Sequence, residues 1–120
     1  NASPMSMEAS LSTLHQATVS KGKRAIAVLG DMLELGHVAV AAHRKVGQQA
    51  AEAGVSCVIT LGEMGREIAA GAKEAGLKQV YACDTHQQAA DRLKALLKPG
   101  DTVLFKGSRG MAMEKIIDLI

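Results

Sequence analysis

Aromatic residues are almost absent from this sequence of 120 residues, which has one tyrosine, one phenylalanine and no tryptophan. Its core must therefore be aliphatic, and a platform of aromatic rings for stacking nucleic-acid bases is excluded. The formal net charge is only +2 and is spread along the chain, so no strongly basic surface is available for nucleic acid or a membrane. We expect neither of these among the partners.

Long hydrophobic runs are also lacking. No stretch approaches the roughly 20 apolar residues that cross a bilayer, and residues 1–4 do not have the pattern of a signal peptide. Cys57 and Cys83 lie in separate apolar segments. If these segments are neighbouring parallel strands, an offset of roughly three or four residues is too large for a disulfide. The pattern predicts a cytoplasmic protein with two reduced, buried cysteines, and no metal-ligand spacing is present.

Short apolar segments alternate with helical patterns along the whole chain. The strand-like segments are continuously hydrophobic, which is typical of parallel strands covered on both faces. They span residues 24–29, 56–61, 79–83 and 102–105. The helical patterns span residues 4–19, 38–53, 64–75 and 85–97, with a last one that runs from about residue 111 to the end. We predict an α/β fold, namely a Rossmann-like, doubly wound, mainly parallel sheet with helices on both faces and strand order 3-2-1-4.

The two ends of the chain indicate how it is organised. It opens at a helix cap, Ser3-Pro4, where a βα repeat usually opens with a strand, and its last helical pattern ends on apolar residues without a capping glycine. No linker or low-complexity segment interrupts residues 1–120. We expect a single domain excised from a longer multidomain enzyme, and the alternative is a complete small protein.

Ligands of a doubly wound sheet bind where the strand order reverses, here beside the loops after the first and fourth strands. The loop after the fourth strand is Lys106-Gly107-Ser108-Arg109-Gly110. Its glycines allow backbone N–H groups to face a ligand, and a helix expected to start there adds a partial positive charge. Lys106 and Arg109 suit a carboxylate or a phosphate. The loop predicts an anion site; the alternative is that Ser108 only caps the helix and both cations lie in solvent.

The loop after the first strand, residues 30–36, is of a different kind. Asp31 is suited to a metal or a ribose, or to a simple turn, and the sequence leaves these readings open. Met32, Leu33 and Leu35 are apolar and predict packing against this domain or another one. Neither G-x-G-x-x-G nor G-x-x-x-x-G-K-[ST] occurs in the chain, which disfavours a dinucleotide site and an autonomous NTPase.

These segments resemble a known family. Residues 30–36 (G-D-M-L-E-L-G), His43 with Val46-Gly47, and residues 100–114, which contain K-G-S-R-G-M-A-M-E, are similar to the carboxy-terminal domain of a Mur ligase. Residues 1–4 resemble the end of that family's D-x-Y-N-A-N-P segment, with Ser3 in place of the usual asparagine. The resemblance covers essentially the whole chain. Taken alone, a single helical histidine such as His43 is more often structural than catalytic.

The resemblance implies a cytoplasmic, ATP- and Mg²⁺-dependent ligase of peptidoglycan synthesis that adds D-alanyl-D-alanine to UDP-N-acetylmuramoyl-tripeptide. In the family the phosphate loop and the metal ligands belong to the central domain. The resemblance therefore implies no catalytic residue and no metal ligand in this chain, and no tight binding of ATP or Mg²⁺ by this domain alone. It implies that this domain closes onto the enzyme's own N-terminal and central domains and helps to bind the incoming dipeptide and the nucleotide.

The candidate site residues follow from these loops and the resemblance. The residues expected to bind substrate are Lys106, Gly107, Ser108, Arg109 and Asn1. The residues expected on the ATP side are Asp31 and Asn1. The isolated domain is expected to be inactive.

Two other functions fit parts of the pattern. A receiver-like signalling module would place an acidic group after its first strand and a lysine after its last, as Asp31 and Lys106 do. It would also need a phosphoacceptor aspartate after a middle strand, where residues 60–62 read Thr-Leu-Gly. Labelling with acetyl phosphate would identify such a module. The other alternative is a stand-alone nucleotide-sugar binding domain, which calorimetry on the chain would reveal.

Overall fold

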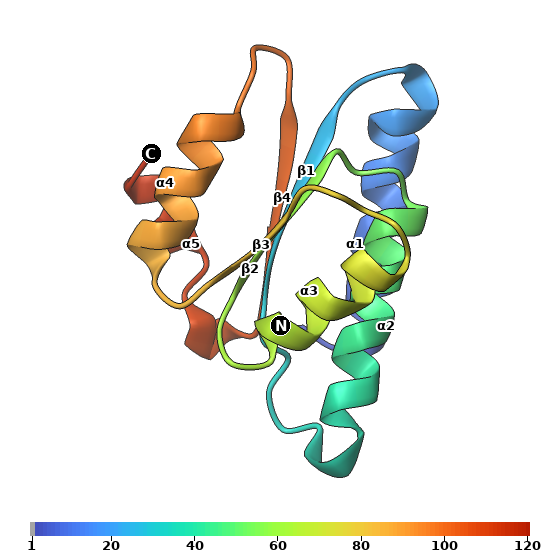
Figure 1. The fold of residues 1–120 in the computed structure, drawn as a ribbon, viewed down its shortest axis with the longest axis vertical. Coiled ribbons are helices and arrows are strands. Elements are labelled where there is room, and N and C mark those ends of the chain that lie inside the picture. The colour runs from blue at the N-terminus through green and yellow to red at the C-terminus, as the bar shows by residue number, and fades with distance from the viewer. Residues whose placement is uncertain (1) are drawn as a thin grey trace.

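The computed structural model describes residues 2–120, which fold as a parallel sheet between two layers of helices (Figure 1). The strands are β1 (Ala25–Gly30), β2 (Cys57–Leu61), β3 (Val80–Cys83) and β4 (Thr102–Lys106). Their order is β3-β2-β1-β4, and the neighbouring strands pair in parallel. The α/β class, the parallel sheet and the strand order predicted from the sequence are confirmed.

The helices divide between the two faces of the sheet (Figure 1). On one face lie α1 (Pro4–Ala17), α2 (Ala39–Glu52) and α3 (Gly65–Glu74), and on the other lie α4 (His86–Leu96) and α5 (Glu114–Asp118). Short 3₁₀ turns lie between a helix and a strand at three places: η1 (Val19–Lys21) between α1 and β1, η2 (Gly36–Val38) between β1 and α2, and η3 (Arg109–Met111) between β4 and α5. Within residues 2–120, no helix has the length and apolar character needed to cross a bilayer.

Local sequence signals start two of these helices where they were expected. Ser3 forms a capping box with Ser6, in which each side chain accepts from the other residue's backbone N–H, and Pro4 occupies the first turn of α1. Thr85 caps α4, because its hydroxyl oxygen accepts from the Gln88 N–H at 3.1 Å. These caps satisfy N–H groups that have no partner inside the helix.

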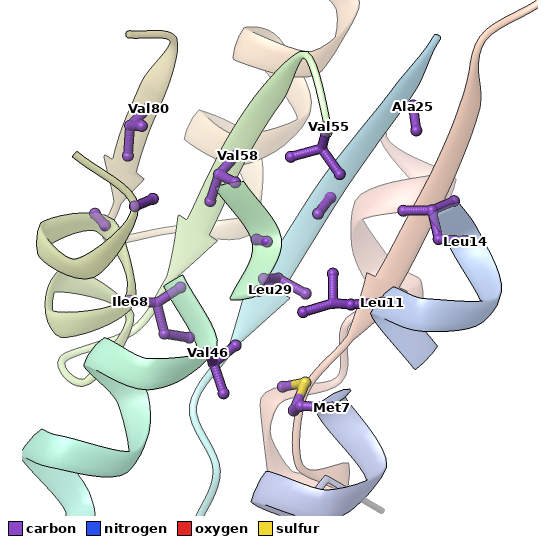
Figure 2. Close-up of a cluster of buried hydrophobic side chains, with 14 of the residues drawn as sticks. Met7, Leu11, Leu14, Ala25, Leu29, Val46, Val55, Val58, Ile68 and Val80 are labelled. Carbon is purple, nitrogen blue, oxygen red and sulfur yellow. The ribbon is translucent and has the colours of Figure 1, made fainter. Parts of the chain in front are cut away.

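A hydrophobic core fills each face of the sheet, which explains the continuous hydrophobicity of the strands. Every residue of β1 is buried, and successive residues point to opposite cores. Figure 2 shows the core beneath α1, α2 and α3, where Met7, Leu11 and Leu14 of α1 pack over the sheet. The opposite core contains Leu93 of α4 and Ile116 of α5.

The cysteines lie in the core between the sheet and α4 and α5. Cys57 pairs in register with Ile26 at the start of β2, whereas Cys83 pairs with Leu61 at the other end of that strand. Both thiols are free and buried, as the sequence predicted. Burial raises the pKa of Cys57 to about 11 and also raises the pKa of Cys83.

The last helix is present but shorter than the sequence predicted. The pattern indicated a helix from about residue 111 to the end of the chain, but α5 spans only Glu114–Asp118. It is separated from β4 by η3 and by Ala112, which has a left-handed backbone (φ 46°). A left-handed residue cannot continue an α-helix, so the helical pattern is broken at Ala112.

Candidate functional site

The loops after β1, β2 and β4 meet at the lower end of the sheet in Figure 1, because parallel strands all end at the same edge. β1 pairs with β2 on one side and with β4 on the other. The chain therefore leaves β1 toward one face of the sheet and leaves β4 toward the other, which is the arrangement that opens a ligand crevice. The two loops selected from the sequence are brought together here.

The loop after β4 approaches the end of β1 closely. A Cβ on Gly107 would lie 3.1 Å from the Gly30 Cα and 3.0 Å from the Met113 Cγ, so only glycine fits without displacing its neighbours. Lys106 is half-buried as the last residue of β4, and the Arg109 side chain is exposed. Both cations expected to bind an anion are therefore at the crevice.

Ser108 is buried, and its polar groups reach the loop after β1. Its N–H donates to the Asp31 carbonyl at 2.9 Å, and its hydroxyl oxygen accepts from the Leu33 N–H at 2.9 Å. The hydroxyl does not cap η3. Ser108 thus links the two loops, a role that its position in the sequence did not reveal.

Asp31 is buried and fixes the start of α3. Its Oδ1 accepts from the Gly65 N–H at 2.8 Å, which places an acidic group at the positive end of that helix. This contact gives Asp31 the structural role that the sequence left open beside metal or ribose binding. Within residues 2–120, no group of three or more His, Cys, Asp or Glu side chains is arranged to hold a metal ion.

His43 is fully buried on α2 and holds the next residue of the same loop. Its Nε2 accepts from the Met32 N–H at 2.9 Å, so the ring proton is on Nδ1, which donates to the Ala39 carbonyl at 2.6 Å. The histidine therefore has a structural role in holding this loop, as a lone helical histidine was expected to have. Met32 is buried within the domain, whereas Leu33 is exposed.

Backbone strain coincides with these two loops. Over residues 2–120, the non-glycine residues with positive φ are Glu34 (64°), in the loop after β1, and Ala112 (46°), in the segment after β4. Each such conformation costs roughly 1–2 kcal/mol and persists where the surrounding structure imposes it. Strain of this kind concentrates at functional sites, and here it marks both sides of the same crevice.

An open pocket of about 340 Å³ lies along the loop after β4. Its apolar wall is formed by Phe105, Met113 and Ile117, and its charged residues are Lys106, Arg109 and Glu114. Two cations against one carboxylate leave the pocket with a net positive charge. It is suited to a small ligand that combines an anionic group with short apolar parts.

One expectation about this site needs correction, and another concerns a residue outside the described part of the chain. The helix that was to add positive charge to the Lys106–Gly110 loop does not start there, since η3 and Ala112 precede the short helix α5. A helix end is therefore not available to an anion at this loop, whereas the side chains and backbone N–H groups of the loop are. Asn1, expected to bind substrate and to lie on the ATP side, is outside the described residues.

Comparison with known proteins gives one consistent family. The family model described as "Mur ligase, glutamate ligase domain" matches residues 1–109. UDP-N-acetylmuramoyl-tripeptide–D-alanyl-D-alanine ligase of Bacillus subtilis (strain 168) is 39% identical over all of this chain and 26% of its own length. The enzyme of the same name from Treponema pallidum (strain Nichols) is 38% identical, again over all of this chain and 26% of its own.

Solved structures agree with the sequence relatives. A structure of MurF from Acinetobacter baumannii superposes on 99% of this chain and 26% of its own, with a TM-score of 0.82 and 29% identity. MurF ligase from Thermotoga maritima in complex with ADP covers 99% of this chain and 26% of its own, with a TM-score of 0.79 and 25% identity. The chain thus spans about a quarter of the length of the relatives that it matches.

Proposed function

This chain belongs to the Mur ligase family, and from that membership we propose that it is the carboxy-terminal domain of the ATP-dependent ligase that adds D-alanyl-D-alanine to UDP-N-acetylmuramoyl-tripeptide. The observation that carries the proposal is the match of the whole chain to relatives that bear this enzyme's name. Those relatives are about four times as long as this chain. We propose that the activity belongs to a longer, multidomain enzyme of peptidoglycan synthesis in the cytoplasm. This chain supplies part of its substrate-binding surface.

For this chain we propose the task of holding the incoming dipeptide. D-alanyl-D-alanine has a free carboxylate and two methyl groups, and the pocket beside β4 offers Lys106 and Arg109 next to an apolar wall. The planar guanidinium of Arg109 is suited to a bidentate hold on the carboxylate, and Lys106 adds a point charge. Gly107 contributes the close backbone approach that shapes this wall.

The chemistry of the whole enzyme needs ATP and Mg²⁺. The relative from Thermotoga maritima was solved with ADP, which supports ATP as the nucleotide. The side chains of residues 2–120 do not fit a metal site, since they contain no suitable cluster, and we assign Mg²⁺ to the enzyme's other domains. Asp31 and Asn1 stay predictions for the ATP side.

The contribution of this domain to the reaction is positional. The dipeptide amine must reach an activated tripeptide carboxylate, and both reactants must be held in line for bond formation. Fixing two reactants in a reactive geometry supplies up to roughly 7–11 kcal/mol of barrier reduction. A domain that binds one reactant and closes over the other therefore promotes ligation without a nucleophile of its own.

Kinetics of the full-length ligase test this assignment. Arg109→Ala removes the bidentate contact, and hydrogen bonds to charged groups are worth roughly 1.5–3 kcal/mol. The KM for D-alanyl-D-alanine should therefore rise about tenfold or more, while the KM for ATP changes little. Arg109→Lys should restore only part of the affinity, because an ammonium cannot reproduce the planar fork.

Arg92→Ala is the matched control. Arg92 is also an exposed arginine, but it lies over the Tyr81 ring on the outer part of the sheet and does not line the pocket beside β4. It should leave the dipeptide KM unchanged. If Arg109→Ala raises the KM for ATP rather than the KM for the dipeptide, or raises neither, the assignment of the dipeptide carboxylate to Arg109 is wrong.

A further inference from the structure

Ser108, which immediately precedes Arg109, is anchored through three polar groups. Its N–H donates to the Asp31 carbonyl (2.9 Å), its carbonyl accepts from the Met111 N–H (2.8 Å), and its hydroxyl oxygen accepts from the Leu33 N–H (2.9 Å). The residue is buried, so solvent does not compete strongly for these bonds. Ser108 is therefore a fixed point at the base of the exposed Arg109 side chain.

The loop to which Ser108 is tied is itself held at consecutive residues. The Asp31 carboxylate accepts from the first N–H of α3, at Gly65. The Met32 N–H donates to His43 on α2. Residues 31–33 are thus bonded in turn to α3, to α2 and to the loop after β4, and the loop has a position that the packed helices determine.

We propose that Ser108 is a positioning residue, which ties the loop after β4 to the loop after β1 and so fixes where the Arg109 guanidinium meets the substrate carboxylate. This inference rests on the proposed function, because it concerns the same dipeptide. Ser108 is also one of the residues expected from the sequence to bind substrate, which stays a prediction. In the structure its hydroxyl oxygen accepts from the Leu33 N–H, and the effect on the dipeptide proposed for it is indirect.

The physical reason for this role is the conformational entropy that Arg109 and its loop lose when the dipeptide binds. A long side chain loses conformational freedom when it binds a ligand, and that loss weakens binding. When the backbone at its base is already fixed, only the side-chain torsions remain to be ordered. Loosening Ser108 adds the backbone of the loop to what the ligand must order, so the affinity for the dipeptide falls while the fold persists.

The test compares Ser108→Ala with Ser108→Thr and Thr85→Ala in the full-length ligase. Ser108→Ala removes one hydroxyl that accepts a backbone N–H, and Thr85→Ala removes another of the same kind at the start of α4, where the donor is Gln88 rather than a residue of either loop. Loss of one such bond corresponds to about a fivefold change in an equilibrium constant. We expect Ser108→Ala to raise the dipeptide KM about fivefold with the ATP KM unchanged, and Thr85→Ala to change neither.

Two further readouts separate positioning from simple loss of stability. Ser108→Thr keeps the hydroxyl and should restore most of the dipeptide affinity. Hydrogen exchange on the same proteins should show faster exchange of the Leu33 amide and of residues 109–111 in Ser108→Ala, and faster exchange at Gln88 only in Thr85→Ala. Unchanged exchange in the loops, an unchanged dipeptide KM in Ser108→Ala, or an equal rise in Thr85→Ala overturns the proposal.

Arg109→Ala distinguishes this inference from the function on which it rests. If Arg109→Ala raises the dipeptide KM and Ser108→Ala does not, the loop binds the dipeptide but Ser108 does not position it. If neither variant changes the dipeptide KM, the assignment of the dipeptide to this loop fails, and the positioning role fails with it.

Discussion

At the scale of single residues, the ionisation of the buried Cys57 thiol makes the free energy of unfolding depend on pH. Burial raises its thiol pKa to about 11, and the positive charges of Arg24 and Arg92 only partly offset this. The unfolded chain ionises near the ordinary value of 9.0, so between about pH 9 and pH 11 the folded state binds more protons than the unfolded one. The free energy of unfolding therefore falls as the pH rises through this range.

We expect urea unfolding of the chain to show this alkaline loss of stability, with a lower midpoint at about pH 10 than at about pH 8. Cys57→Ala should have a smaller change in midpoint between the two pH values, because it removes one thiol with a raised pKa. Its lower stability from the lost core volume is present at both pH values and cancels in the comparison. An identical pH dependence in the variant and the parent would contradict the role given to Cys57.

The residue scale is also where the sequence is least informative about the site. The sequence predicted that residues 106–110 and 30–36 follow neighbouring strands and lie together, and the structure places them so, because positions directly after strands are local features. The contacts of Asp31, Ser108 and His43 are not local. Asp31 and Gly65 are 34 residues apart in the sequence, and Ser108 and Leu33 are 75 apart. Partners this distant can be identified only when the fold is known.

At the scale of elements, α2 and α3 pack closely because two glycines face the crossing. A Cβ on Gly47 of α2 would overlap the Ile68 carbonyl oxygen of α3, and a Cβ on Gly71 of α3 would overlap the Arg44 carbonyl oxygen of α2. Both glycines are buried inside helices, where glycine is otherwise unfavourable. The close approach of the two backbones explains their presence.

Replacing either glycine therefore tests the crossing. In an open helix, Gly→Ala stabilises by up to about 1 kcal/mol through helix propensity. Here we expect Gly47→Ala and Gly71→Ala each to destabilise the chain by about 3 kcal/mol or more, since backbone atoms rather than flexible side chains must move apart. Thermal unfolding measures the change. A neutral or stabilising result for either variant would mean that the helices separate at little cost.

Elements that have one dominant local signal were predicted well from the sequence. The strands are continuous apolar runs, and α1 and α4 begin at the expected caps Ser3 and Thr85. The start of the last helix was predicted less well. Residues 111–115 are good helix formers in isolation, but tertiary contacts decide their conformation. Met113 is buried against the glycines at 30 and 107, and that packing favours a left-handed Ala112 over a continuous helix.

At the scale of the whole molecule, the features that bear on function gather at one end of the sheet. The Arg109 loop, the strained residues Glu34 and Ala112, and the contacts of Ser108 all lie where β1 and β4 end. The rest of the chain is two aliphatic cores that hold these loops in place. This arrangement suits a domain that presents one reactant to another part of a larger enzyme.

That division of labour predicts the behaviour of the 120-residue chain by itself. It should fold, because both faces of its sheet are covered, but purified chain supplied with Mg²⁺, ATP, tripeptide substrate and dipeptide should release no phosphate. Phosphoryl transfer needs groups that cradle the phosphates and hold the metal; the sequence has no G-x-x-x-x-G-K-[ST] loop, and residues 2–120 have no metal-binding cluster. The full-length ligase assayed in parallel provides the positive control. Phosphate release by the chain that Lys106→Ala abolishes would show that the nucleotide chemistry resides in this domain after all.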